Sequence, residues 1–263
     1  MNGKIKGLLI ICANLLIVLA IAALWLHAIK THRNVKSEGI SIRLVSEIKG
    51  DSLISTKDVY GWLYSFYKKD PRKMPVWSLN LVKLEEFINS QELVKRSDIY
   101  LDSKEHLNID IYQRHPIIRI SDVQGNQYYL DEEGYKIPVS VKYTSRVLVA
   151  TGNLAAIPGK SLDKTTRNYY SGLLDIAKAL RKDTFANSLI EQIYLDENGE
   201  FTLIPKIGNE RIFLGNSEIL EDKLLRLKLF YKENMGRQGW NVYQVVNLKF
   251  KGQVIGKKIQ QES

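Results

Sequence analysis

The sequence contains almost no cysteine. Its single cysteine, Cys12, lies inside an apolar stretch near the start of the chain, so the residues after that stretch can form no disulfide among themselves. They also offer no thiolate for a metal site or for nucleophilic catalysis. A body without thiols suits an oxidising compartment outside the cytoplasm, although it does not require one.

The common catalytic and nucleotide-binding motifs are also missing. There is no P-loop, G-x-S-x-G, H-E-x-x-H or G-x-G-x-x-G pattern. The Ser-x-x-Lys pairs Ser65 with Lys68 and Ser161 with Lys164 lack the Ser-Asp-Asn and Lys-Thr-Gly companions of penicillin-binding proteins. Ser65 falls inside an expected helix and Ser161 where a helix cap belongs. These local roles explain both pairs, and a Ser-Lys acyl hydrolase is kept as an alternative.

Neither a metal site nor a nucleic-acid interface is expected. His106 and His115 have no evident carboxylate partner, and a zinc site needs three or four converging donors. The run Asp131-Glu132-Glu133 is typical of a solvated turn. The basic residues are scattered and form no zinc-finger, helix-turn-helix or RNP pattern. We therefore expect no cofactor, no metal and no small-molecule substrate.

One long hydrophobic run is present, from Gly7 to Ile29, and it contains no Asp, Glu, Lys or Arg. At about 1.5 Å per residue a helix of this length reaches roughly 35 Å, enough to cross a bilayer. A cleaved signal peptide is the alternative, but its apolar region has only about 7–15 residues. We expect a short head over 1–6, a single membrane helix over 7–29 and a linker over 30–39. Basic residues on the two flanks nearly balance, so the positive-inside rule does not fix the orientation.

The chain is basic, with a formal net charge of +9. This surplus suggests a negatively charged neighbour, such as lipid headgroups, an anionic wall polymer or an acidic partner protein. A well-solvated surface would give the same composition.

The periodicity of residues 40–113 predicts a compact α+β module. Ser55-Thr56-Lys57-Asp58 has the form of a helix start, and apolar residues follow it at helical spacing. Alternating residues predict strands on either side of the polar turn 102–106. In chain order we expect a strand over 40–45, helices over 55–67 and 80–89, and strands over 99–101 and 107–112. The helices should cover one face of the sheet.

Residues 114–258 predict a β-rich domain with covering helices, followed by a tail over 259–263. Glu197-Asn198-Gly199 is a hairpin signal, and Asn216-Ser217 is the expected cap of the last helix. The expected strands cover 117–122, 127–131, 135–139, 147–150, 190–195, 200–204, 211–214, 240–250 and 253–257, and the expected helices cover 164–181 and 216–233. The overall class is therefore α+β.

Four short motifs, in this order after one apolar stretch, resemble the FtsQ/DivIB family of bacterial cell-division proteins. The likeness covers most of residues 40–257. The motifs are Leu107 to Ile111 followed by Arg114 and Pro116; the Tyr-Leu-Asp-x-x-Gly hairpin of Tyr128 to Gly134; Phe213-Leu214-Gly215 with Lys223, Leu224 and Leu227; and Val246 to Phe250 with Gln253 to Ile255.

This chain departs from the usual family pattern at several motif positions. Gln113 replaces the usual Glu, Asn247 the usual Asp, Lys249 the usual Arg and Phe250 the usual Tyr. Lysine keeps the charge at position 249 but loses the bidentate guanidinium fork. The departures and the composition indicate a divergent branch.

The resemblance implies a short cytoplasmic head, one helix in the inner membrane, a POTRA-like module over 40–113 and a β domain over 114–258 in the periplasm. It implies a non-enzymatic scaffold of the divisome, located at midcell. Its partners would be FtsB- and FtsL-like bitopic proteins, and it would help to control septal peptidoglycan synthesis. A POTRA-bearing envelope assembly factor, which also binds polypeptide, is the alternative.

The C-terminal strands offer a binding mechanism, because a partner segment can add itself to an exposed sheet edge as another strand. On this hypothesis Phe250 is the apolar anchor, Lys249 the steering charge, and the backbone from Gly252 to Val254 the ladder. The alternative is that Phe250 and Val254 are ordinary core residues of a strand.

Overall fold

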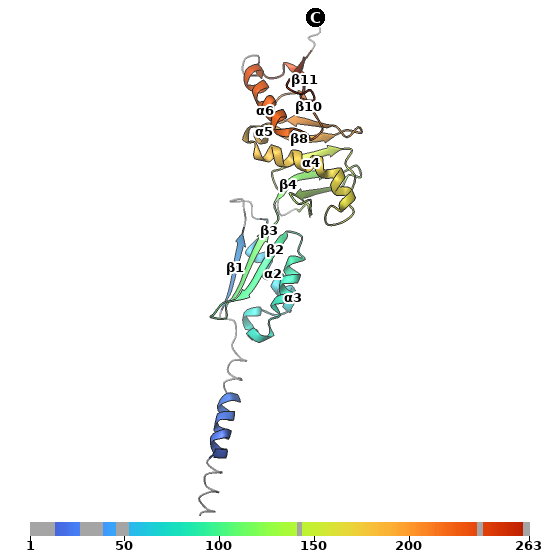
Figure 1. Cartoon of the computed structure of the whole chain (residues 1–263). Helices are drawn as coiled ribbons and strands as arrows, with labels where there is room; N and C mark the ends of the chain where they lie inside the picture. The colour runs from blue at the N-terminus through green and yellow to red at the C-terminus, as the bar shows by residue number, and fades with distance from the viewer. Residues whose placement is uncertain (1–13, 27–38, 46–52, 141–143, 236–238, 260–263) are drawn as a thin grey trace, which may run out of the picture. The chain divides into compact units, whose positions relative to one another are not determined.

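The computed structural model describes residues 14–26, 39–45, 53–140, 144–235 and 239–259 (Figure 1). The chain divides into two compact units, unit 1 over Met1–Gln113 and unit 2 over Arg114–Ser263. Each unit has its own hydrophobic core.

Residues 14–26 form a helix whose apolar side chains are exposed, with Leu16 at 67% and Leu24 at 70%. The predicted membrane helix over 7–29 extends at both ends outside the described residues. At about 1.5 Å per residue the described part is about 20 Å long, which is less than the roughly 30 Å of a bilayer core. Among the residues described, no helix is long and apolar enough to cross a membrane.

The folded part of unit 1 is a three-stranded sheet with helices packed on it. The sheet order is β1-β3-β2, with β1 parallel and β2 antiparallel to the central β3. In chain order the elements are β1 (Ile40–Val45), α2 (Thr56–Tyr67), the short 3-10 helices η1 (Pro71–Lys73) and η2 (Val76–Ser78), α3 (Leu81–Asn89), β2 (Val94–Leu101) and β3 (Leu107–Gln113). The predicted order of strands and helices is confirmed.

The predicted start of α2 is confirmed in detail. The Ser55 hydroxyl oxygen accepts a hydrogen bond from the Asp58 amide at 3.2 Å, and the Asp58 carboxylate accepts one from the Ser55 amide at 3.0 Å. This capping box satisfies two amides that the helix cannot pair. Val59 and Leu63 then enter the core from the same helix face, both 0% exposed. In contrast, β2 begins five residues earlier than the predicted strand 99–101, because a bulge between Val94 and Arg96 interrupts the alternation.

Unit 2 is built on one nine-stranded sheet in the order β12-β11-β10-β9-β8-β7-β4-β5-β6. Its strands are β4 (Pro116–Ser121), β5 (Gln127–Asp131), β6 (Lys136–Pro138), β7 (Leu148–Gly152), β8 (Ile190–Leu195), β9 (Phe201–Pro205), β10 (Arg211–Gly215), β11 (Tyr243–Asn247) and β12 (Ile255–Lys258). The turn at Gly199, with φ +78°, joins β8 and β9 as the hairpin signal predicts.

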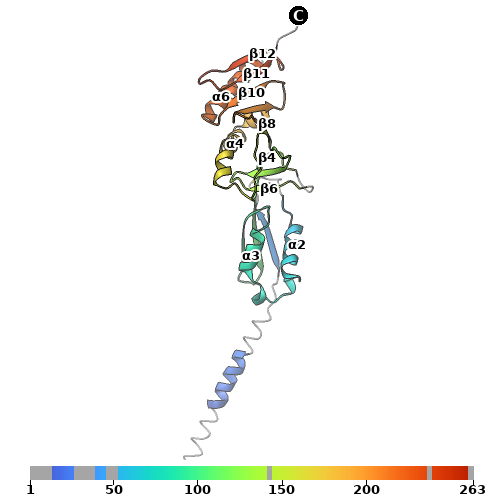
Figure 2. The same ribbon diagram turned by 90° about the vertical axis from the view of Figure 1, so that its right-hand side faces the viewer.

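Two parallel strand pairs explain why helices are present in unit 2. β7 runs parallel to β8, and β10 runs parallel to β11, so each pair needs a crossover connection. The crossovers contain α4 (Lys164–Lys182) with α5 (Thr184–Leu189), and α6 (Leu220–Phe230) with the π-helical turn η3 (Tyr231–Met235). Figures 1 and 2 show α4 and α6 on the same face of the sheet. The α+β class is therefore confirmed.

Asp183 joins α4 to α5, a helix that the sequence did not predict. Its amide donates to the Ala179 carbonyl at the end of α4, and its carboxylate accepts from the Ala186 amide at 2.8 Å. One residue therefore ends one helix and caps the next.

The predicted cap of α6 is wrong. The helix starts at Leu220, after Ile219 in the left-handed region at φ 51°, and no side chain caps it. The Asn216 side-chain oxygen instead accepts from the Lys223 ammonium at 3.0 Å. Asn216 is thus held by a residue of the helix itself, and the chain turns once more before the helix begins.

Two of the sequence motifs meet in a buried ion pair at the start of unit 2. Arg114 Nη1 donates to Asp131 Oδ2 at 2.7 Å, and the two side chains are only 12% and 5% exposed. The Arg114 guanidinium also lies 3.6 Å from the centre of the Tyr135 ring. The other Asp131 oxygen accepts from the amides of Glu133 at 3.0 Å and Tyr135 at 2.8 Å, which forms the turn closed by Gly134. Asp131 therefore links the first motif to the second.

Replacing Arg114 by methionine should leave the Asp131 carboxylate buried without its cation. We expect the free energy of unfolding of unit 2 to fall by about 3 kcal/mol, because the Asp131 carboxylate would stay buried and charged with no cation beside it. Native-state hydrogen exchange at the core amides of β4 and β5 measures this change. Arg181→Met, at an exposed position near the end of α4, is the matched control and should change the value by less than about 0.5 kcal/mol. Equal effects of the two variants would contradict a structural role for the pair.

Candidate functional site

The two edges of the sheet of unit 2 differ in how open they are. β6 has three residues, ends in Pro138 and is flanked by the 160–161 segment, where the Lys136 amide donates to the Lys160 carbonyl at 2.8 Å. β12 pairs with β11 on one side, and on its other side it pairs with none of the described strands. All four residues of β12 are exposed. The edge at β12 is therefore the one that can accept another strand.

An aromatic surface supports the inner side of β12. A Cβ atom added to Gly256 would lie 2.5 Å from Cε1 of Tyr243 and 3.2 Å from Cζ of Phe230. The rings of Phe230 and Tyr243 pack edge-to-face with their centres 5.0 Å apart. Because glycine has no side chain, the backbone of β12 lies directly on these rings.

Arg226 of α6 holds the loop that leads into β12. Its Nη1 donates to the carbonyls of Phe250, at 2.9 Å, and Gln253, and its Nη2 lies 3.4 Å from the Leu248 carbonyl oxygen. Its Nε donates to Asp222 at 2.8 Å, one turn earlier on the helix, and the Arg226 side chain is 12% exposed. Asp222 fixes the guanidinium plane, and the guanidinium fixes the course of residues 248–253.

This arrangement corrects the predicted strand boundaries. The strand predicted over 240–250 ends at Asn247, and the last strand begins at Ile255 rather than at Gln253. Gly252 lies in a turn at φ +73°. Gly252 to Val254, the expected ladder, therefore lie outside the strands, and the strand at this edge is β12. The predicted strand failed because residues 248–254 are held by a side chain distant in sequence.

The structure separates the two apolar residues of the predicted site. Phe250 is 47% exposed, so the alternative that it fills the core is wrong. Val254 is partly buried and packs against the hydrophobic core of unit 2. Phe250 is thus the one of the pair that is available at the surface.

The lysine of the predicted site is already paired. Lys249 Nζ lies 2.6 Å from Glu200 Oε1, and the two side chains are 38% and 46% exposed. Its stem packs beside Gly215, where an added Cβ atom would lie 3.0 Å from Lys249 Cγ. Gly215 at φ +75° therefore provides both the turn after β10 and the space for this stem.

Residues 249–258 contain four lysines and no acidic residue, and Lys251, Lys257 and Lys258 are exposed. Glu200 offsets only Lys249 among these lysines. Lys223, on the helix behind the loop, is buried, and this desolvation together with the charge of Arg226 lowers its pKa. The surface around β12 thus favours an acidic partner segment.

Sequence reasoning missed Arg226, Asp222 and the exposed Ile255 of β12. The spacing of Asp222 and Arg226 is that of an i,i+4 ion pair on a helix, so the pair itself could have been predicted. The three carbonyl groups that Arg226 binds could not, because loop carbonyls have no signature in the sequence.

The Ser-x-x-Lys pairs do not form a recognisable catalytic group. Ser65 is exposed on α2, and its Lys68 is the left-handed C-cap of that helix. Ser161 forms an isolated bridge with Tyr135, and the N-cap of α4 is Asp163 rather than Ser161. The expected cap role of Ser161 is therefore wrong.

His106 does have a carboxylate neighbour, which corrects the sequence prediction. Its Nδ1 lies 3.0 Å from Asp102 Oδ2, and the bonds from the His106 amide and ring lower the pKa of Asp102 to about 2. The pair closes the turn between β2 and β3. Within the part of the chain that is described, no three His, Cys, Asp or Glu side chains gather as a metal ion would require.

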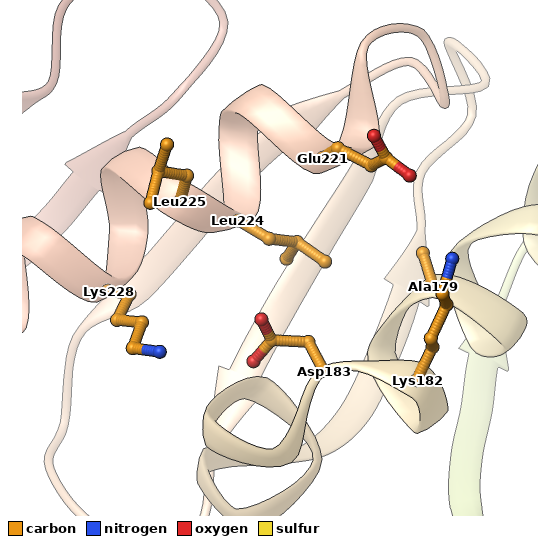
Figure 3. Close-up of a pocket in the computed structure, with 7 residues that line it drawn as sticks. All are labelled: Ala179, Lys182, Asp183, Glu221, Leu224, Leu225 and Lys228. Carbon is orange, nitrogen blue, oxygen red and sulfur yellow. The ribbon is translucent and has the colours of Figure 1, made fainter.

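A pocket of about 280 Å³ lies between the C-terminal end of α4 and the outer side of α6 (Figure 3). Leu224 of α6 and Asp183 face the pocket from opposite sides. The Asp183 carboxylate is the cap of α5. The lining residues are Ala179, Lys182, Asp183, Glu221, Leu224, Leu225 and Lys228. None of these seven is a serine, cysteine or histidine, so this lining contains no Ser–His or Cys–His pair.

Replacing Arg226 by alanine should release the loop without unfolding unit 2. We expect amides of residues 249–253 to exchange at least about 10-fold faster, since the loop loses hydrogen bonds to a charged group. Hydrogen exchange with mass spectrometry measures this effect. Lys228→Ala, on the same helix but facing the pocket, is the control and should leave the loop unchanged. Unchanged exchange in the Arg226 variant would show that the guanidinium does not hold the loop.

Comparison with known families agrees with the motifs. A family model described as FtsQ/DivIB, C-terminal related, matches residues 115–257, which is more than half of the 263 residues and lies within unit 2. No curated protein matches the chain. The matched range contains α6, the loop 248–254 and β12 through Lys257. The chain therefore belongs to the FtsQ/DivIB-related family of cell-division proteins.

Proposed function

We propose that this protein is a non-enzymatic scaffold of the bacterial divisome that recruits partner proteins at the β12 edge. The observation that carries the proposal is the open, basic edge strand inside the region matched to the division family. The partners would be FtsB- and FtsL-like bitopic proteins. By recruiting them, the scaffold would help to control septal peptidoglycan synthesis.

Strand addition is the binding mode that the geometry supports best. An edge strand presents unpaired backbone N–H and C=O groups, so a partner segment gains a ladder of hydrogen bonds by extending the sheet. The aromatic surface under Gly256 and the Arg226 bonds keep β12 and its loop in place. A pre-ordered edge lowers the entropy that a partner must lose on binding.

The side chains around the edge would select the partner segment. Phe250 in the loop that precedes β12 and Ile255 at the start of β12, both 47% exposed, offer apolar contacts. Lys251, Lys257 and Lys258 favour acidic residues in the partner. The expected partner segment therefore combines apolar and acidic residues in an extended conformation.

The rest of the chain would place this edge near the septum. We assign residues 1–6 to a cytoplasmic head, 7–29 to a single helix in the inner membrane, 40–113 to a POTRA-like module and 114–258 to the β domain, both in the periplasm. The apolar stretch without charges supports the anchor. The strand and helix order of unit 1 supports a small protein-docking module, and a division scaffold of this kind would locate to midcell.

Phe250→Asp should prevent recovery of FtsB/FtsL-like partners from detergent extracts, with affinity reduced by about 30-fold or more, as for loss of a central apolar anchor. Co-purification measures recovery, and circular dichroism should be unchanged because Phe250 lies in an exposed loop. Ile207→Asp, which alters an apolar residue of unit 2 that is 59% exposed, is the matched control and should bind normally.

In dividing cells a fluorescent fusion of the wild-type protein should form a midcell band. Undiminished recovery with Phe250→Asp would remove the edge-strand proposal, and a uniform envelope signal would argue against the division role.

A further inference from the structure

One end of unit 1 is defined by its topology as the end where the chain enters. β1 begins there at Ile40, which pairs with Leu107, and Leu101 of β2 pairs with Leu107 from the other side. β2 runs toward this end, and α3 connects to the start of β2 through only the four residues 90–93. α3 therefore begins at the same end, together with η1, η2 and the C-terminal part of α2, as Figures 1 and 2 show. We name this the proximal end of unit 1.

The proximal end exposes large apolar and aromatic side chains. Tyr64 near the end of α2 is 63% exposed, Trp77 in η2 is 64% exposed, and Val82 at the start of α3 is 70% exposed. They lie next to the core of unit 1 in sequence but do not contribute to its buried cluster. Exposed large apolar side chains at one end of a small module mark a candidate interaction surface.

The same segment is strongly basic. Residues 64–83 contain five basic side chains and one acidic one, and Lys68, Lys69 and Lys73 are exposed. The one carboxylate, Asp70, is bound to Arg72, with Nη2 and Oδ2 2.9 Å apart. The end therefore presents lysines beside a tryptophan and a tyrosine, the residue types that anchor proteins at the membrane–water interface.

Chain length brings this end close to the bilayer. The apolar stretch ends at Ile29 and β1 starts at Ile40, so ten residues, 30–39, separate them. A connector of this length spans at most about 35 Å even when fully extended. The proximal end therefore stays within about 35 Å of the bilayer surface, and a connector that is not fully extended brings it to the headgroups.

We propose that the proximal end of unit 1 docks on the anionic headgroup surface of the membrane that holds residues 7–29. This inference rests on the membrane anchor of the proposed function. Lys68, Lys69 and Lys73 supply the electrostatic attraction, and Trp77 and Tyr64 insert their rings at headgroup level. Docking holds unit 1 against the bilayer and limits how far the chain that follows Gln113 can move from it.

Hydroxyl-radical footprinting of the full-length protein in lipid nanodiscs tests the proposal, because it reports the solvent access of individual tryptophan and tyrosine side chains. Trp77 and Tyr64 should be protected in nanodiscs of phosphatidylcholine with phosphatidylglycerol, and not in nanodiscs of phosphatidylcholine alone. Trp240, which is 46% exposed in unit 2, is the internal control and should react equally in both. High salt should remove the protection.

Charge variants separate membrane docking from other contacts. Changing Lys68, Lys69 and Lys73 together to glutamine should weaken docking by about 100-fold, at the usual gain for each basic residue near an anionic surface. The matched control changes Lys251, Lys257 and Lys258 of unit 2 to glutamine and should keep the protection. Three results would overturn the proposal. They are equal oxidation of Trp77 in both lipids, protection that survives the glutamine change of Lys68, Lys69 and Lys73, and protection without anionic lipid. Failure of the chain to enter nanodiscs would instead contradict the membrane anchor. Neither loss of docking nor loss of the anchor bears on the recovery of partners at β12.

Discussion

The guanidinium of Arg226 is the interaction on which the C-terminal edge of unit 2 depends. Residues 248–254 contain no regular secondary structure, yet they must bring the chain back from β11 so that β12 pairs with it. Arg226 binds carbonyl groups along this loop, and Asp222 holds the guanidinium in place. α6 itself is required by the parallel pair β10–β11. One crossover helix therefore both covers the core and sets the shape of the proposed binding surface.

The sheet of unit 2 uses its two edges differently. An exposed edge invites unwanted association, and proteins usually shorten it, interrupt it with proline or cover it. β6 shows all three features, with three residues, Pro138 and the neighbouring 160–161 segment. β12 is also short, with four residues, but it contains no proline and none of the described strands pairs with its outer side, and its lysines would repel another copy of the same edge. This asymmetry fits the proposed recruitment of acidic segments at one edge.

Sequence patterns predicted most elements because local chemistry fixes them. The Ser55 capping box and the turn at Gly199 each depend on residues close together in the chain. One failure has a non-local cause. The loop 248–254 is shaped by Arg226 from α6. The expected helix caps at Asn216 and Ser161 failed because Lys223 binds Asn216 and because Asp163 caps α4 instead.

The structure bears on the geometry of the predicted site, and the role of the site in binding stays a prediction. The motif resemblance located it at the last two strands, and Phe250 is exposed there as an anchor requires. Glu200 offsets the charge of Lys249, which no local pattern in the sequence indicated. The last strand begins at Ile255 rather than at Gln253, because periodicity alone cannot show where a loop held by distant hydrogen bonds ends.

Amide exchange at β12, measured with and without a bound FtsB/FtsL-like partner, tests the central claim most directly. If the partner adds a strand to this edge, exchange of amides within Ile255–Lys258 slows on binding, while β6 at the opposite edge is unaffected. If β12 exchanges at the same rate in the complex, or if protection appears only at other elements, then the partner does not extend the sheet and the account is wrong.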